Sequence, residues 1–140
     1  MMEKDLGRFL TAQENIYEKV LLEINNSVKK NYCLWYIFPQ LEGLGYSPAA
    51  EHYGICGLSE ARDYLAHEIL GARLIELTEA LLNLDLNDTT DIFGNPDNDK
   101  FLASMTLFHM ADESNPVFIK AIDKFFNGKP DKKTLELLGK

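Results

Sequence analysis

The chain has 140 residues, of which 46% are hydrophobic and 26% are charged, and its formal net charge is −8. This length fits one domain with its own core, and the composition excludes an intrinsically disordered chain. The acidic excess argues against a nucleic-acid partner, because affinity for phosphate backbones depends on Lys and Arg.

Two cysteines, Cys33 and Cys56, are too few for a disulfide scaffold and indicate a reducing compartment. The first five residues are charged and lack the apolar core of a signal peptide. No apolar run approaches the roughly 20 residues that span a bilayer. We therefore expect a cytoplasmic protein with no membrane partner.

Residues 6–28 carry a helical pattern, because apolar side chains recur at steps of three and four. Thr11 and Glu14 have the spacing of a capping box, which could divide this segment into two helices. The shared face is formed by Leu6, Phe9, Leu10, Gln13, Tyr17, Val20, Leu21 and Ile24.

The stretch from Tyr32 to Phe38 is apolar and short, so its pattern fits either a buried strand or a buried helical turn. Gly43 and Gly45 follow, and glycine permits positive φ or close backbone approach. Ser47 and Pro48 then have the pattern of an N-cap and a first helical position.

A glycine loop that enters a helix leaves backbone N–H groups available to an anion. One interpretation of this loop is purely structural: a tight connection that packs Trp35 and Phe38 into the core. The spacing is not that of a dinucleotide-binding loop, because Pro48 stands where a third glycine belongs. The other interpretation is a small anion or ligand site lined by Trp35, Gln40, Gly43, Gly45 and Ser47.

Apolar stripes predict several later helices, and no segment alternates as a strand would. Residues 85–91 resemble a calcium loop, but Thr90 and Pro96 occupy the positions that need glycine and glutamate, so we expect a solvated loop. The predicted helices are Pro48 to about Tyr53, a helix capped by Ser59 that runs through Ala61 and Leu65, a stripe from Leu70 to Leu84, about 97 to 111 with Asp97 as a cap, Asn115-Pro116 to Phe126, and a last turn from Thr134 to Leu138.

The predicted helix 97–111 places Lys100 and Ser104 one turn apart. Ser104, Thr106 and His109 add hydroxyls and an imidazole to an apolar run. Either these groups form part of a site, or the hydroxyls bond back to the preceding turn and His109 is exposed. We expect this helix and the aromatic-glycine turn to wall a shared polar hollow.

The pattern as a whole predicts an all-α fold: one mostly helical domain over residues 1–140, with about six to eight helices, several of them short. Metal and cofactor sites are not predicted, since the three histidines have no ligand spacing. Glu42 and Glu51 flank the glycine loop and are the candidate catalytic pair, although sequence does not give their separation, on which glycosidic chemistry depends.

The block Trp35-x-x-Phe38-Pro39-Gln40-x-x-Gly43-Leu44-Gly45-x-Ser47 closely resembles a bacterial family known as domain of unknown function 1810. Further matching pieces include Leu70-Gly71-x-Arg73-Leu74 and Ser104-Met105-Thr106-Leu107-Phe108. The resemblance covers nearly the whole chain and implies a small all-helical domain of no known activity. The family often has His-Trp where this chain has Tyr32 and Cys33. The residues carried over as ligand-binding candidates are Trp35, Gln40, Gly43, Gly45, Ser47, Lys100 and Ser104.

Three functions remain open, and a binding module for a small anionic metabolite or a peptide is favoured. The second is a hydrolase or N-glycosidase-like enzyme that acts on a nucleotide-like metabolite, with Glu51 or Glu42 as acid/base and Lys100 on a phosphate. Glu51-His52-Tyr53 is similar to a tripeptide of helical N-glycosidases. The third is a partner-binding or oligomerisation domain, and the oligomeric state itself is not predicted.

Overall fold

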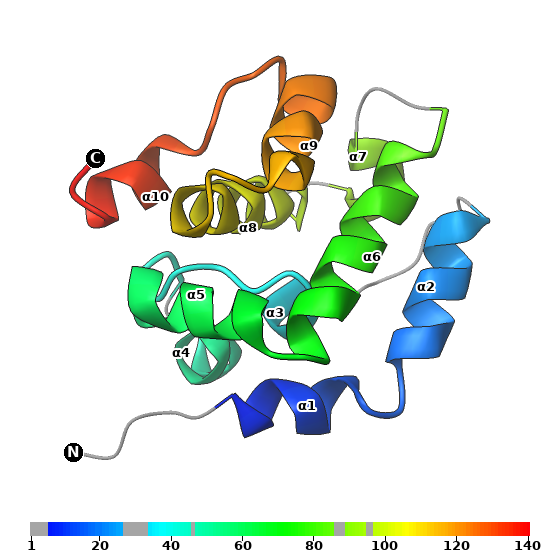
Figure 1. Cartoon of the computed structure of the whole chain (residues 1–140), viewed down its shortest axis with the longest axis horizontal. Helices are drawn as coiled ribbons and strands as arrows, with labels where there is room; N and C mark the ends of the chain where they lie inside the picture. Colours follow the sequence, from blue (N-terminus) through cyan, green and yellow to red (C-terminus); the bar gives the residue numbers. More distant parts are fainter. Residues whose placement is uncertain (1–5, 27–33, 46, 86–88, 95–96) are drawn as a thin grey trace.

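The computed structural model describes residues 6–26, 34–45, 47–85, 89–94 and 97–140 (Figure 1). These residues form helices and no strand, which confirms the predicted all-α fold; one isolated bridge joins Leu41 and Ile55. The helices are α1 (Gly7–Gln13), α2 (Tyr17–Asn25), α3 (Leu34–Ile37), α4 (Pro48–Tyr53), α5 (Leu58–Ala66), α6 (Leu70–Leu82), α7 (Thr90–Phe93), α8 (Asp97–Ala111), α9 (Pro116–Phe126) and α10 (Lys132–Leu137).

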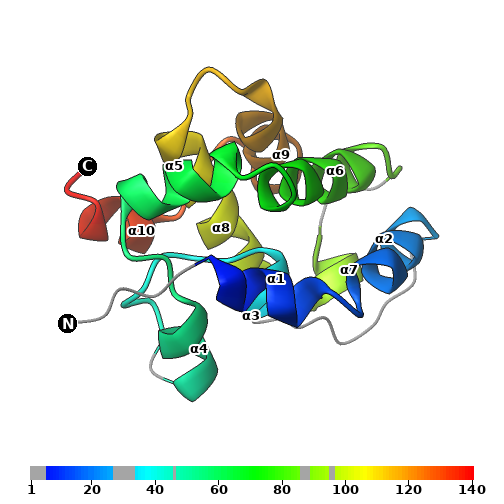
Figure 2. The ribbon, with the colours of Figure 1, turned by 60° about the horizontal axis from the view of Figure 1, so that its bottom comes forward.

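Helix α8 is the centre of the molecule. Figure 2 shows it between α5, α9 and α6 on one side and α3, α1 and α7 on the other, and it also packs against α10. Its apolar side chains point in every direction, as expected of a helix that is surrounded by protein. Phe101, Met105, Leu107 and Phe108 are all fully buried.

The first helical segment is divided, because α1 ends at Gln13 and α2 begins at Tyr17. The predicted capping box is wrong, since Thr11 lies inside α1 and no side chain caps α2. The buried Gln13 instead joins the end of α1 to its neighbours. Its Nε2 donates to the carbonyl of Tyr36 at 2.6 Å and to the hydroxyl of Tyr64 at 3.1 Å.

The apolar stretch before Pro39 is a helical turn, α3, and not a strand. Phe38 follows it and packs edge-on against Phe101 of α8, with ring centroids 5.0 Å apart. The chain then turns back on itself, because the Ile55 N–H donates to Gln40 and the Glu42 N–H donates to Ile55, each at 2.9 Å. Tyr32 and Cys33 lie outside the described residues.

Local capping chemistry predicted two helix starts. Ser47 accepts from the Ala50 N–H at the start of α4, and Asn115 accepts from the Val117 N–H at the start of α9. Two other predicted caps are wrong: Ser59 lies inside α5, which begins at Leu58, and Asp97 is itself the first residue of α8. In neither helix does local spacing alone locate the first turn.

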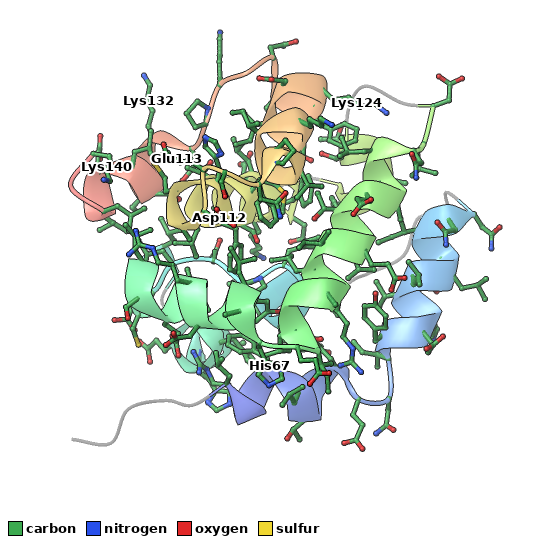
Figure 3. All side chains as sticks on the ribbon, viewed as in Figure 1. His67, Asp112, Glu113, Lys124, Lys132 and Lys140 are labelled. Carbon is green, nitrogen blue, oxygen red and sulfur yellow. The ribbon has the colours of Figure 1, made fainter. Side chains whose placement is uncertain are left out.

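Two features were not expected from the sequence: the helix α7 and the cap at the start of α6. The one-turn helix α7 lies where a loop was predicted, and it is tied to α8 because the buried Thr89 hydroxyl donates to Asn98 Oδ1. The start of α6 is capped by His67, whose Nδ1 accepts from the N–H groups of Ile69 and Leu70. Figure 3 shows His67 at the turn from α5 to α6, beside α1.

Arg8 of α1 fastens this helix to the chain around α4 and α5. Its guanidinium donates to the carbonyls of His52 and Gly54 and forms a two-pronged pair with Glu60, with both distances 3.1 Å. The Arg8 and Glu60 side chains are only 6% and 13% exposed. Burial alone would raise the pKa of Glu60, but hydrogen bonds from Arg8 and the Cys56 N–H, with the Arg8 charge, lower it.

We expect Glu60→Gln to destabilise the protein at neutral pH by roughly 2 kcal/mol, because it removes a charge-assisted pair. The folded-state pKa of Glu60 is below its ordinary value of 4.5, so this stabilisation is complete above that pH and is lost as the pH falls through the folded pKa. Urea unfolding at pH 7 and at a pH well below 4.5 should therefore show a gap between wild type and variant that narrows in acid. Glu68→Gln, at an exposed position, is the control. An equal gap at both pH values would contradict the ionic origin.

Gly71 lies in the first turn of α6, where α6 passes very close to α5. A Cβ at this position would lie 2.1 Å from the carbonyl oxygen of Leu65. We expect Gly71→Ala to destabilise the fold by about 3 kcal/mol, although helix propensity alone favours alanine by about 1 kcal/mol. The matched control is Gly57→Ala, where nothing lies within 4 Å of the added atom. Chemical denaturation of both variants decides this, and equal stabilities would show that the contact relaxes at little cost.

Candidate functional site

The described residues enclose a hollow of about 310 Å³ at the point where three segments of the chain meet. Its walls are α3 and the following glycine turn, the first turns of α8, and the start of α10. The lining residues are Trp35, Gln40, Leu44, Gly45, Asp99, Lys100, Ala103, Asp131 and Lys133. We call this space the Trp35 hollow.

Four of the predicted site residues meet in the Trp35 hollow. Trp35, Gln40 and Gly45 come from the first predicted segment, and Lys100 comes from the second. The Lys100 ammonium lies 4.3 Å from the centroid of the Trp35 ring and 3.0 Å from Asp97 Oδ1. This cation–π contact places the tryptophan and a positive charge side by side on the wall.

The two predicted glycines have different roles. A Cβ on Gly45 would lie 3.0 Å from Ala50 Cβ and 3.7 Å from the Trp35 ring, so its missing side chain allows the turn to approach both. Gly43 has φ +95°, which favours glycine, but it does not line the hollow. It instead faces Leu137 of α10, at 3.5 Å from the Cβ position. For Gly43 the structure therefore favours the role of a tight turn.

Ser47 and Ser104 do not line the Trp35 hollow. Ser47 is exposed, and its hydroxyl accepts from the Ala50 N–H, so its observed role is to cap α4. Ser104 is fully buried, and its Oγ has no hydrogen-bond partner among the described residues. Ser104 lies four residues after Lys100, about 6 Å further along α8, at a turn that the core covers.

The candidate catalytic pair lies outside the hollow. Glu51 is exposed in the first turn of α4, and the exposed Glu42 packs its backbone against Gly54, which has no room for a side chain there. His109 is half-buried rather than exposed. The described residues contain no group of three or more His, Cys, Asp or Glu side chains that could hold a metal ion.

The structure adds three charged residues that the sequence analysis missed, Asp99, Asp131 and Lys133. The last two reach the hollow because the Asp131 N–H donates to the Thr106 hydroxyl of α8 at 2.9 Å. Thr106 also bonds back to the Leu102 carbonyl, as one of the two interpretations of this helix expected. The sequence does contain a signal that could have indicated this wall. Residues 114–140 hold six lysines and only three acidic residues, whereas the whole chain has a net charge of −8.

Two larger hollows, of about 560 and 540 Å³, lie on either side of α6 and share Glu79 and Asn83. Neither is lined by an aromatic side chain. The Lys124 ammonium, which lines the first, is occupied by the carbonyls of Leu82 and Leu84 at 2.7 Å each, and Figure 3 shows it between α9 and the end of α6. The smaller Trp35 hollow therefore has the residue types better suited to hold a polar ligand.

No helix of the described residues is long and apolar enough to cross a membrane.

We expect Ser104→Ala to stabilise the protein by about 1 kcal/mol, because it removes a buried hydroxyl that lacks a partner. Thr106→Val on the same helix should destabilise by about 1 kcal/mol or more, since it leaves the Asp131 N–H without its acceptor. Thermal or urea unfolding of both variants measures this contrast. If Ser104→Ala is the destabilising one, the hydroxyl has a partner in solution and belongs to a deeper part of the site.

Comparison with known proteins agrees with the resemblance. The family model "Protein of unknown function (DUF1810)" matches residues 3–138. The crystal structure of the conserved hypothetical protein Rv1873 from Mycobacterium tuberculosis, at 1.38 Å, superimposes with a TM-score of 0.94, with 41% sequence identity over 98% of each chain. A search of curated proteins finds no match. The chain therefore belongs to the DUF1810 family, whose function is unknown.

Proposed function

We propose that this one-domain helical protein is a cytoplasmic binding module that holds a small metabolite by its anionic group in the Trp35 hollow. The observation that carries the proposal is the meeting of Trp35, Gly45, Lys100 and Lys133 from three segments around one space. A volume of about 310 Å³ is at the lower end of the 300 to 1,000 Å³ typical of ligand pockets. The expected ligand is therefore small.

Each wall supplies a different kind of contact. Lys133 is exposed at the start of α10, and no described residue pairs with its ammonium, so it is available to an anion. Lys100 is held in place by Asp97 and the Trp35 ring, so less side-chain entropy is lost when it binds. Gly45 allows the glycine turn to pack against the Trp35 ring, 3.7 Å from its Cβ position, and so completes this wall of the hollow.

The alternative functions have less support. Glu42 and Glu51, the acid/base candidates of the enzyme hypothesis, do not line the hollow. The exposed large hydrophobic residues of the described chain are Leu22, Ile69 and Leu137, which lie on different elements and do not form the contiguous patch that a partner surface needs.

Trp35 is the only tryptophan in the chain, so its fluorescence reports directly on the hollow. We expect at least one member of a panel of small anions, from inorganic phosphate to sugar phosphates and carboxylic acids, to change this fluorescence with saturation and to raise the melting temperature. Lys133→Gln should weaken that binding by about tenfold, the equivalent of about 1.4 kcal/mol for one charged contact.

Lys129→Gln is the matched control, because Lys129 is also exposed in the same segment but does not line the hollow. It should bind as the wild type does. Failure of every anion to alter fluorescence or melting, or an equal effect of the two substitutions, would refute the proposal.

A further inference from the structure

The Trp35 hollow has two carboxylates as well as two ammonium groups. Asp99 lies in the first turn of α8 and Asp131 caps α10, while Lys100 and Lys133 supply the positive charges. A ligand with several negative charges would meet both carboxylates, and such like-charge contacts disfavour binding. The lining is therefore matched to a ligand that has charges of both signs.

The charged side chains of the lining do not form ion pairs with one another. Lys100 pairs with Asp97, which is outside the lining, and among the described residues no ion pair joins Lys133, Asp99 or Asp131. Asp131 uses Oδ2 to accept from the Thr134 N–H and hydroxyl, while no described residue donates to Oδ1. Asp99 is exposed and has no described partner. Helix α8 and the start of α10 thus each present one carboxylate and one ammonium group to the hollow.

The volume limits the size of the ligand. About 310 Å³ is roughly ten times the ~30 Å³ that one water molecule occupies in the liquid. A free amino acid fits this space.

We infer that the ligand of the Trp35 hollow is a zwitterion of amino-acid size, with its acid group at Lys100 and Lys133 and its amino group at Asp99 and Asp131. This inference rests on the proposed function and names the class of its ligand. The Trp35 ring, which already contacts one ammonium at 4.3 Å, is a suitable neighbour for the amino group of the ligand.

The test is calorimetry with Trp35 fluorescence on three matched probe sets: free amino acids, their N-acetyl derivatives, which retain only the acid, and their amides, which retain only the amine. The best free amino acid should bind at least tenfold more tightly than either of its derivatives. Asp99→Asn should weaken binding of the free amino acid by about tenfold and leave binding of the N-acetyl form unchanged. Lys133→Gln should weaken binding of the free amino acid by about tenfold and leave binding of the amide unchanged. Asp63→Asn, at an exposed position on α5, is the control.

The outcomes distinguish the zwitterion inference from the proposed binding function on which it rests. If N-acetyl forms or simple anions bind as well as free amino acids, and Asp99→Asn changes nothing, the zwitterion inference is wrong while the binding module stands. Binding of the amides alone would overturn the inference as well, because the acid group would have no role. If neither these probes nor any anion binds, both proposals fail.

Discussion

The fold depends on the burial of α8 from all sides. Phe101, Met105 and Phe108 are fully buried between the surrounding helices, and removal of this apolar surface from water is the main stabilising force. Phe101 alone contacts the rings of Phe38, Phe93, Phe125 and Phe126. Because the middle of α8 is enclosed, only its ends can offer polar groups to solvent, and the Trp35 hollow forms at one of them.

The enclosure of α8 explains why one predicted site residue of this helix lines the hollow and the other does not. Lys100 lies near the start of α8 and reaches the surface, whereas Ser104 is one turn deeper and is enclosed by the core. The same helical face thus carries a candidate ligand contact and a buried hydroxyl. A sequence pattern gives the phase of a helix but not the depth at which each turn is covered, so Ser104 could not be separated from Lys100 in advance.

The sequence predicts those features that are determined by neighbouring residues. Ser47 before Pro48 and Asn115 before Pro116 cap their helices because the capping bond closes within three residues. Features that depend on distant residues were missed: Arg8 binds Glu60, and Asp131 reaches the hollow through Thr106. The cap of α6 by His67 is local, but it was also missed because histidine is not among the usual capping residues. Three of the nine lining residues could therefore be proposed from one motif and Lys100 from a second segment, while the α10 wall required the tertiary arrangement.

The α10 wall is joined to the rest of the protein by a short connection. Residues 127–130 between α9 and α10 are all exposed, and Asn127 and Gly128 both have positive φ. A cut in this connection by a protease would leave α10 held only by its contacts with α8, such as the hydrogen bond from Asp131 to Thr106. Release of α10 would remove a wall of the hollow and two of its four charges, and it would also expose the face of α8 that α10 covers, so that recognition and stability both depend on this connection.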